Sequence, residues 1–364
     1  MANLNIIIPI WQFGKAGGLR VLSKLANAFK EMGHNVLVIS YYKNNEEPYF
    51  PIECDVKYVV EEGNFAEPTI EPKKNRLTKN LEEYTRYKAL LNALNNLSDR
   101  YDIALANANK TAFSVSKSKI KNKFYYIQAY EAWYTQKIGF VYNYLAKKSY
   151  KLNNLIKIVN ADLYKDYKEI HTDYVVPPGL DLDLYHIKDK SAYWDKKRSF
   201  VIGHIGRIEE WKGSRETAEA VKILQKEGVN VKYQVAFNPP AEDICDYELV
   251  KPDGDVNLSN YYRSVDVLVA PCSIQLGAIH YPVIEAMACG TPVVTTGYYP
   301  ATNENAYIVG VNSPNEISNA VKDIMNNYNL AMQKVQIAND KLKEFAWDKV
   351  SEKMIDIIVK NLKK

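Results

Sequence analysis

The sequence has few residues of the kinds that build disulfide frameworks or metal centres. Its 364 residues include only four cysteines, which lie far apart, and five histidines, none of them paired at a helical i, i+4 spacing. We therefore expect buried reduced thiols, no structural metal and a reducing cytoplasmic location. The cysteines are Cys54, Cys245, Cys272 and Cys289, and the histidines are His34, His171, His186, His204 and His280.

Long apolar runs are scarce as well. No apolar segment approaches the roughly 20 residues that a membrane-spanning helix needs. The N-terminus lacks the charged-then-apolar shape of a signal peptide. With 47% hydrophobic and 25% charged residues, the chain is not a disordered polymer. Its length suits about two globular domains, each with its own core.

An excess of one charge sign is nearly absent, since 47 basic residues face 43 acidic ones. This balance does not point to a nucleic-acid partner. The charge is unevenly placed, however, with a net +7 over residues 1–180 and −3 over residues 181–364. Residues Lys73 to Lys168 alone carry a net +12, with tyrosines interleaved. Such a face would attract an anionic membrane surface, although a solvated lysine-rich face is an equally good interpretation.

The first half of the chain opens with the pattern strand, glycine-rich turn, helix, strand. We predict a strand over residues 5–10, a turn over 14–18, a helix that ends at Gly33 and a strand over 35–40. A parallel βαβ unit of this kind implies a sheet covered by helices on both faces. Two more buried strands, separated by a helical segment, are predicted at 102–106 and 123–127.

A second unit of the same kind begins near Ser199. The two prolines of Val175 to Gly179 break regular structure and predict a linker before it. The fold class is therefore α/β with two doubly wound domains, which we place at residues 1–178 and 179–345, followed by a last helix over 346–364. The elements predicted in the second half are strands at 200–205, 229–237, 266–270 and 291–295, a polar turn at 206–213, helices at 216–227 and after Pro282, and a last helix with one apolar face formed by Trp347, Val350, Met354, Ile357 and Ile358.

Ligands of such sheets bind beyond the carboxyl ends of the strands, so the loops at 14–18, 206–213 and 271–282 are the candidate site loops. In the third loop, Pro282 suits the first position of a helix whose free N–H groups would attract phosphate. Glu285, about one turn inside, could accept hydrogen bonds from ligand hydroxyls. The alternative is a first-turn carboxylate that complements the helix dipole.

The second loop places two cations, Arg207 and Lys212, at the end of one strand. An arginine fork and a flexible ammonium suit a diphosphate without a metal ion, whereas solvated surface charge is the alternative. A nucleotide would then lie in the C-terminal domain. In the first loop, Gly17 and Gly18 would allow close approach of a ligand, although a plain tight turn explains them equally well.

These stretches resemble the retaining family 4 glycosyltransferases of GT-B fold. The similar motifs are Gly206-Arg207 with Lys212-Gly213, the segment from Tyr281 to Val294 (Tyr-Pro-Val-Ile-Glu-Ala-Met-Ala-Cys-Gly-Thr-Pro-Val-Val), and the N-terminal Gly17-Gly18-Leu19-Arg20 with Gly33-His34. The resemblance covers both domains. It implies two Rossmann-like domains that face an interdomain cleft, with the C-terminal helix returning to the N-terminal domain.

The resemblance also implies roles for single residues. Arg207 and Lys212 would hold the diphosphate of a nucleotide sugar, beside Gly206, and Glu285 would bind the ribose. Backbone near Pro282 and Val283 would meet a phosphate. Sugar transfer would retain the anomeric configuration and need neither metal nor other cofactor.

Two positions depart from or refine this pattern. The family's Glu-x7-Glu element has Gly277 where its first Glu is expected. Either the donor sugar lacks the hydroxyl that this carboxylate would bind, or Gln275 or His280 replaces the carboxylate, or transfer is impaired. The stretch Gln128-Ala-Tyr-Glu131 is similar to a branch that includes bacterial polysaccharide rhamnosyltransferases. Gln128 and Glu131 could orient sugar hydroxyls, although a surface turn is an equally good interpretation.

The sequence thus predicts a metal-independent retaining glycosyltransferase. It would move a hexose or deoxyhexose from a nucleoside diphosphate to a saccharide or lipid-linked saccharide of a growing bacterial surface polysaccharide. A peripheral contact with the inner face of the plasma membrane would accompany this activity. The alternative is a catalytically weak partner subunit or carbohydrate-binding module of another transferase. The motifs argue against a sugar-nucleotide epimerase, and the short chain argues against a phosphorylase.

Overall fold

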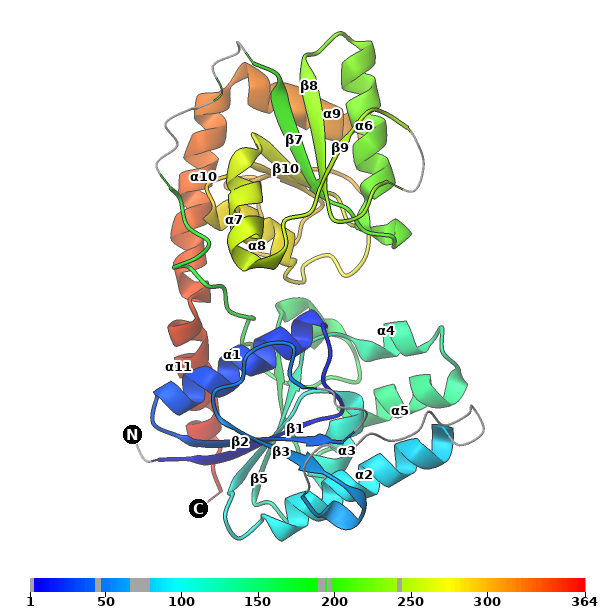
Figure 1. Ribbon diagram of the computed structural model, residues 1–364, viewed down its shortest axis with the longest axis vertical. Helices are drawn as coiled ribbons and strands as arrows, with labels where there is room; N and C mark the ends of the chain where they lie inside the picture. The colour runs from blue at the N-terminus through cyan, green and yellow to red at the C-terminus, as the bar shows by residue number, and fades with distance from the viewer. Residues whose placement is uncertain are drawn as a thin grey trace. The chain divides into compact units, whose positions relative to one another are not determined.

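The computed structural model describes residues 3–42, 47–65, 79–188, 194, 198–240 and 244–363. The chain divides into two compact units (Figure 1). Unit 1 comprises Met1–Gly179 and Trp347–Lys364, and unit 2 comprises Leu180–Ala346. Each unit has its own parallel sheet.

Unit 1 is built on one sheet of six described strands in the order β3-β2-β1-β4-β5-β6, all parallel. This is the strand order of a dinucleotide-binding fold, in which the chain reverses direction across the sheet between β1 and β4. The strands are β1 (Asn5–Ile10), β2 (Asn35–Tyr41), β3 (Asp55–Val59), β4 (Ile103–Ala106), β5 (Asn122–Ile127) and β6 (Ile156–Val159).

Helices cover both faces of this sheet, and the strands are apolar on both sides as a result. Alternate residues of β1 face the two sides of the sheet. Ile7 belongs to the core cluster that packs under α2, α3 and α5. Ile6 and Ile8 are buried as well, but outside that cluster. On the other side α1 lies beside the last helix, α11 (Figure 1). The helices are α1 (Gly17–Glu31), α2 (Lys79–Asn96), α3 (Asn109–Lys117), α4 (Glu131–Thr135), α5 (Phe140–Tyr150) and α11 (Trp347–Lys360), with 3-10 turns at Glu61–Gly63 and Asp162–Asp166.

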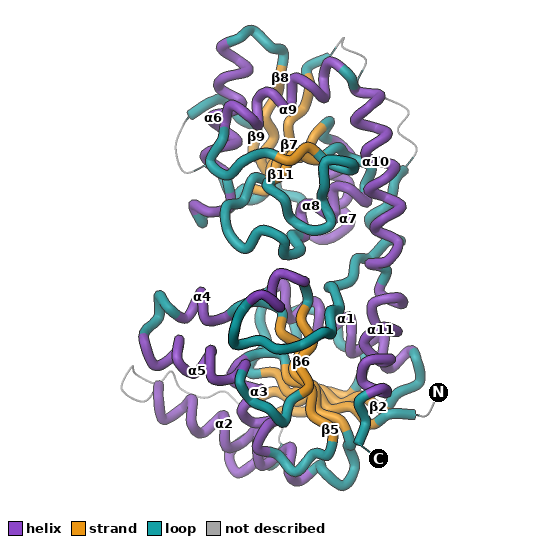
Figure 2. The backbone as a smooth tube through the Cα atoms, turned by 180° about the vertical axis from the view of Figure 1, so that it is seen from behind, coloured by secondary structure: helices purple, strands orange, loops and turns teal. Residues whose placement is uncertain are grey.

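Unit 2 repeats the same topology. Its described strands run β12-β11-β10-β7-β8-β9, so β7 and β10 occupy the places that β1 and β4 have in unit 1. The strands are β7 (Phe200–Ile205), β8 (Val231–Ala236), β9 (Glu248–Val250), β10 (Val267–Ala270), β11 (Val293–Thr295) and β12 (Tyr307–Ile308). The helices are α6 (Ser214–Lys226), α7 (Gly254–Ser264), α8 (Tyr281–Ala288), α9 (Pro314–Asn326) and α10 (Tyr328–Leu342), with 3-10 turns at Glu210–Lys212 and Lys343–Phe345 (Figure 2).

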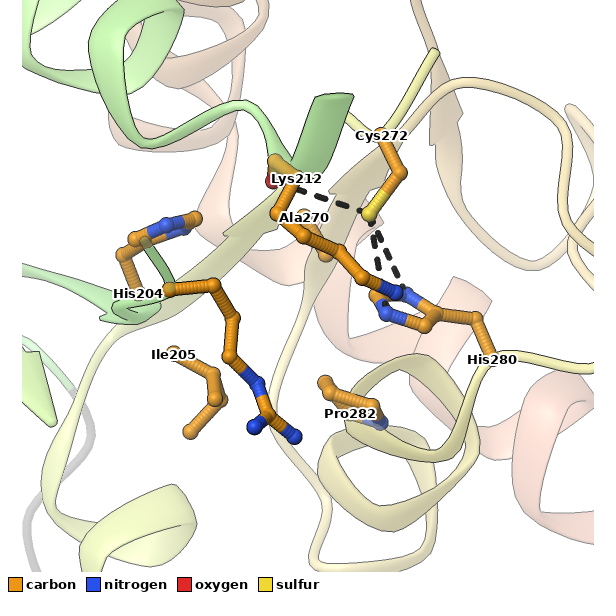
Figure 3. Close-up of a pocket in the computed structure, with 8 residues that line it drawn as sticks. His204, Ile205, Lys212, Ala270, Cys272, His280 and Pro282 are labelled. Atoms are coloured by element: carbon orange, nitrogen blue, oxygen red, sulfur yellow. Dashed lines mark hydrogen bonds between the residues drawn. The ribbon is translucent and has the colours of Figure 1, made fainter. Parts of the chain in front are cut away.

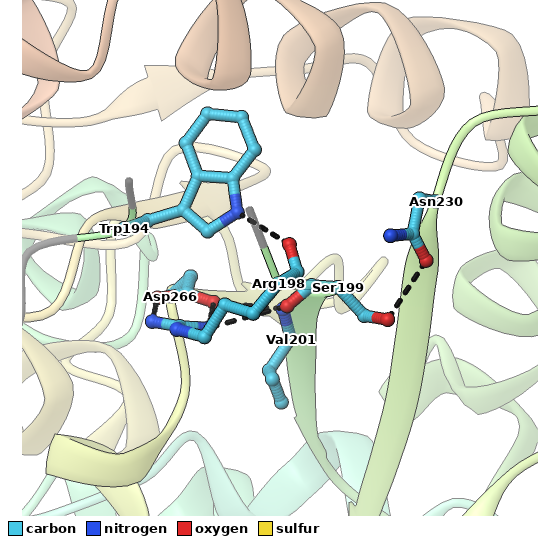
Figure 4. Close-up of polar contacts among 6 residues, drawn as sticks. All are labelled: Trp194, Arg198, Ser199, Val201, Asn230 and Asp266. Atoms are coloured by element: carbon cyan, nitrogen blue, oxygen red, sulfur yellow. Dashed lines mark hydrogen bonds and ion pairs between the residues drawn. The ribbon is translucent and has the colours of Figure 1, made fainter. Parts of the chain in front are cut away.

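A polar clamp fixes the start of β7 against β10 (Figure 4). Arg198 donates two hydrogen bonds of 2.6 Å to the carboxylate of Asp266, which also accepts from the N–H of Val201 at 2.8 Å. Asp266 is buried, so these three donors offset the cost of taking its charge out of water. The clamp aligns the two strands whose far ends carry the candidate site.

The structure corrects several expectations from the sequence. Helix α1 begins at Gly17, so Gly17 and Gly18 form its first turn and not the end of a glycine-rich loop. Val175 and Val176 are not irregular linker but pair with Val159 of β6. Cys245 is only half-buried, while the other three thiols are buried.

Candidate nucleotide site in unit 2

The loops that follow β7 and β10 begin side by side at the carboxyl edge of the sheet, where the strand order reverses. They bring together four of the residues singled out from the sequence. Arg207 and Lys212 come from the first loop, and His280 and Pro282 from the second, and all four line one pocket (Figure 3). His204, Ile205, Ala270 and Cys272 complete its lining.

Two glycines explain how the first loop holds its shape. A Cβ on Gly206 would lie 1.8 Å from the carbonyl oxygen of Asn238, so only glycine fits there. Gly213 has a φ of +80° and packs against Pro271, where a Cβ would come within 2.7 Å. The Gly-Arg and Lys-Gly pairs therefore place their cations on a tightly packed turn.

A chain of buried hydrogen bonds, which the sequence did not predict, holds the backbone of Arg207. His204 Nδ1 lies 2.8 Å from the carbonyl oxygen of Val269. A carbonyl can only accept, so Nδ1 carries the proton and Nε2 must accept. Ser214 Oγ lies 2.9 Å from Nε2 and can donate its hydroxyl proton to it, with the Arg207 carbonyl as a second acceptor at 3.2 Å. The same oxygen accepts the backbone N–H of Arg207 at 3.3 Å.

Burial keeps this chain in one protonation state. His204 is 2% exposed, and desolvation lowers its pKa to about 4, so the imidazole is neutral near pH 7. The available signal in the sequence was a single polar residue inside the apolar strand Phe-Val-Ile-Gly-His-Ile, because a buried imidazole needs partners.

The far wall of the pocket pairs a thiol with an imidazole. Cys272 Sγ lies 3.6 Å from His280 Nε2, and the Lys212 side chain extends toward the same ring (Figure 3). Burial, with the nearby charges of Lys212 and Arg207, lowers the pKa of His280 well below its usual value. Burial also raises the pKa of Cys272 to about 11. Both groups are therefore neutral at pH 7, and the two cations are the charged groups that line this pocket.

Helix α8 begins at Tyr281, so Pro282 is the second residue of the helix. The sequence predicted that it would be the first. The N–H of Val283 donates to the His280 carbonyl at 2.9 Å. A phosphate contact at the backbone N–H of Val283 remains a prediction. The phosphate would have to share this N–H with the His280 carbonyl.

Glu285 lies deeper than the sequence suggested. It is 3% exposed, is not part of the pocket lining and accepts a hydrogen bond of 2.9 Å from Tyr262 Oη. The first turn of α8 contains no acidic residue, so the alternative role as a first-turn dipole carboxylate is wrong. Ribose binding by Glu285 remains a prediction that requires a ligand to reach this buried carboxylate.

The loop before α8 has a left-handed backbone at Gly277, the position where the resemblance leads one to expect a glutamate. Gly277 has a φ of +89° and donates its N–H to Gly297 at 3.1 Å. An L-residue such as glutamate would be strained there. Gln275 also has a positive φ, +52°, and lies outside the residues that line the pocket, whereas His280 lines it.

In unit 1 the structure brings Gly18 and Gln128 together. Gln128 Nε2 donates to the Gly18 carbonyl at 3.2 Å, and a Cβ on Gly18 would lie 3.3 Å from the Gln128 amide oxygen. Gly17 faces open space. Glu131 belongs to a different environment, a cavity between α2, α3 and α5, and is not part of a surface turn.

Glu131 is held by groups from its own unit. Its Oε1 accepts the N–H of Asn109 at 2.9 Å and the hydroxyl of Tyr125 at 3.3 Å. Desolvation raises its pKa to about 7, against the lowering effect of these hydrogen bonds.

No three His, Cys, Asp or Glu side chains gather as ligands for a metal ion within the described ranges. No helix among the residues that the structure places is both long and apolar enough to cross a membrane.

Comparison with known proteins identifies the class to which this site belongs. Residues 199–327 match the family model for glycosyl transferases group 1. The matched stretch lies within unit 2, and the predicted resemblance to glycosyltransferases is confirmed at this level. The predicted α/β fold of GT-B type is confirmed as well.

The individual proteins that this chain matches share about a quarter of its residues over about half of its length. The chain is 26% identical over 202 residues to a D-inositol 3-phosphate glycosyltransferase of Paenarthrobacter aurescens, covering 49% of each chain. It is 26% identical over 195 residues to the capsular polysaccharide biosynthesis glycosyltransferase CapM of Staphylococcus aureus, covering 48% of this chain and 50% of CapM. The chain thus spans about half the length of the curated relatives it matches.

Two solved structures are similar over nearly the whole chain. Sucrose-phosphate synthase from Thermosynechococcus elongatus superposes with a TM-score of 0.73 at 14% identity, covering 98% of this chain and 99% of its own. HepE of Anabaena in complex with UDP and glucose superposes with a TM-score of 0.70 at 12% identity, covering 98% and 100%. At these identities the likeness defines the fold alone.

Proposed function

We propose that the protein is a retaining glycosyltransferase that uses a nucleoside diphosphate sugar and binds the diphosphate between Arg207 and Lys212. The observation that carries the proposal is the meeting of these two cations at the reversal point of the sheet in a group 1 glycosyltransferase domain. HepE, which has the same fold, was solved with UDP and UDP-glucose, and this supports a nucleotide-sugar donor.

The proposed chemistry rests on position and charge. Two cations neutralise charge that develops on the departing diphosphate, so the reaction needs no metal ion. The acceptor hydroxyl approaches the face of the sugar from which the diphosphate leaves, and it gives its proton to the leaving phosphate oxygen. Because both groups use the same face, the anomeric configuration is retained. The sugar is a hexose or deoxyhexose, and the acceptor belongs to a surface polysaccharide or glycoconjugate.

The test is calorimetric titration with UDP, GDP, dTDP and ADP in EDTA, followed by hydrolysis and transfer assays with the matching sugar nucleotides. We expect Arg207→Ala to weaken binding of the preferred diphosphate at least tenfold, since a charge-assisted hydrogen bond contributes about 1.5 to 3 kcal/mol. Arg215→Ala, which removes a 63% exposed arginine of α6, should leave affinity unchanged. Equal affinities of the two variants, or transfer abolished by EDTA, would contradict the proposal.

The second candidate function is a catalytically weak partner or carbohydrate-binding subunit. The left-handed backbone at Gly277 favours it, because the loop cannot readily accept the carboxylate that relatives use on the donor sugar. Tight diphosphate binding without hydrolysis or transfer of any donor sugar would select this function over the first.

A further inference from the structure

Helix α7 supplies a tyrosine that bonds the buried carboxylate of Glu285. The hydroxyl of Tyr262 donates a hydrogen bond of 2.9 Å to Oε2 of Glu285, which lies on the neighbouring helix α8. Tyr262 is 1% exposed and Glu285 is 3% exposed, so water does not readily replace either partner. Neither residue is part of the lining of the pocket at Arg207 and Lys212.

Other contacts hold Tyr262 itself in one place. Its main-chain carbonyl accepts a hydrogen bond of 2.6 Å from the hydroxyl of Thr291, which lies between α8 and β11. The ring of Tyr185 packs against the ring of Tyr262, with the two centroids 6.4 Å apart. Arg263, the next residue, donates hydrogen bonds of 2.6 Å and 3.1 Å to two main-chain carbonyls of residues 184–186. The end of α7 is therefore tied to two separate segments of unit 2, and the Tyr262 hydroxyl has a fixed position beside α8.

The Tyr262 hydroxyl is a donor throughout the neutral pH range. Burial, together with the nearby charge of Glu285, raises the pKa of Tyr262 well above its usual value. The hydroxyl therefore keeps its proton, and Glu285 Oε2 remains the acceptor. Because one oxygen of the carboxylate is held toward α7, the plane of the whole carboxylate is set by this bond.

The plane of a carboxylate decides which ligand hydroxyls it can bind. Its two oxygens offer about four acceptor sites, and hydrogen donors prefer to lie near the plane of the group. A ribose carries two neighbouring hydroxyls, and both are donors. When a buried acceptor is aimed at a hydroxyl, a ligand that lacks the hydroxyl leaves the acceptor unsatisfied and binds much more weakly. A carboxylate held in one plane therefore discriminates between ribose and deoxyribose more sharply than a carboxylate that can rotate.

We infer that Tyr262 is a positioning residue of the nucleotide site. It orients the Glu285 carboxylate toward the ribose of the donor, and the site thereby selects a ribonucleoside diphosphate sugar over a deoxyribonucleoside diphosphate sugar. The inference rests on the proposed function and on the predicted ribose contact of Glu285, to which it adds the residue that directs the contact and the class of nucleotide that results.

The test measures a ratio of affinities by calorimetry on the full chain. UDP, GDP and ADP are each titrated beside their 2′-deoxy and 3′-deoxy forms, and the base that binds most tightly is kept. We expect the wild type to bind the ribonucleotide at least about tenfold more tightly than one or both deoxy forms, which corresponds to about 1.4 kcal/mol. Tyr262→Phe keeps the aromatic ring and removes only the hydroxyl, and it should lower this ratio to about threefold or less. Partial unfolding weakens the binding of all these nucleotides by the same factor, so the ratio reports the ribose contact and not the stability of the variant.

Tyr233→Phe is the matched control. Tyr233 of β8 is a buried tyrosine of the same unit, 2% exposed, and its hydroxyl has no hydrogen-bond partner among the residues that the structure describes. Removal of this hydroxyl should leave the ratio at the wild-type value. Inorganic pyrophosphate has no ribose, so Tyr262→Phe should bind it as tightly as the wild type does, whereas Arg207→Ala should bind it at least about tenfold more weakly.

A double-mutant cycle shows whether Tyr262 acts through Glu285. Glu285→Gln should lower the ratio at least as far as Tyr262→Phe does. The variant that carries both substitutions should then have the ratio of Glu285→Gln alone, because the hydroxyl has no effect on the ribose once the carboxylate is gone.

The possible outcomes separate this inference from the proposed function. Equal affinities of the wild type for the ribonucleotide and both deoxy forms would overturn the inference, however tightly the nucleotide binds. A wild-type ratio in Tyr262→Phe, effects that add in the double variant, or an equal loss in Tyr233→Phe would overturn it as well. Absence of binding of every nucleoside diphosphate by the wild type would instead refute the proposed function.

Discussion

Removal of the Ser214 hydroxyl tests the buried chain behind the nucleotide site. In Ser214→Ala, His204 Nε2 loses its only hydrogen donor in the chain that the structure describes, and the Arg207 N–H loses an acceptor at 3.3 Å. His204 is 2% and Ser214 6% exposed, so water does not readily replace the hydroxyl. An unsatisfied buried acceptor costs about 1 to 3 kcal/mol.

Thermal unfolding followed by circular dichroism gives the magnitude. In a domain of about 150 to 250 residues each 1 kcal/mol shifts Tm by roughly 2–4 °C, so a cost of about 1 to 3 kcal/mol should lower Tm by roughly 2–12 °C. Ser199→Ala is the control, because that hydroxyl bonds Asn230 at an exposed position and its loss should cost less than about 0.5 kcal/mol. UDP affinity should also fall several-fold, since the backbone of Arg207 is no longer held.

The pKa of His204, about 4, adds a second check. The imidazole is neutral throughout pH 6 to 8, so the Tm difference between Ser214→Ala and wild type should be constant across that interval. A Tm for Ser214→Ala equal to that of Ser199→Ala would refute the hydrogen-bond assignment. A difference that varies with pH in this interval would refute the neutral state of His204.

Three further predictions concern other parts of the molecule. Burial raises the pKa of Glu131 to about 7, so its contribution to stability is greatest below about pH 4.5 and declines as the pH rises toward 7. Glu131→Gln should therefore be more stable than wild type at pH 8, by up to about 3 kcal/mol. Thermal unfolding at pH 4.5 should show no such advantage. Gly206→Ala should lower Tm and abolish UDP binding because its Cβ would strike a backbone oxygen, whereas Gly17→Ala, which faces open space in a helix, should be neutral or stabilising; similar effects would refute the packing argument. Tyr262→Phe removes the 2.9 Å hydrogen bond to buried Glu285 and should cost about 1.5 to 3 kcal/mol in urea unfolding of the variant, and an unchanged midpoint would show that the bond is unimportant.

The sequence by itself determined the order and type of the elements that carry the site. The apolar runs of β1, β7 and β10 and the turn residues after them were readable because a buried parallel strand is apolar on both faces. The motif around Arg207 and Lys212 could be predicted from the sequence because the spacing of glycines and cations is a local property of the chain.

Only the tertiary structure decided which side chains satisfy one another. His204 bonds a carbonyl 65 residues away, Arg86 bonds a side chain 74 residues away, and Glu285 bonds Tyr262 at a separation of 23 residues. No local pattern encodes such pairs, because they depend on the strand order that brings distant loops to one edge of each sheet. The same order assembled the cavity of unit 1 from the ends of β1 and β4, which are nearly a hundred positions apart in the sequence. A buried polar group must find its partner wherever the fold places one, and that requirement acts in space and not along the chain.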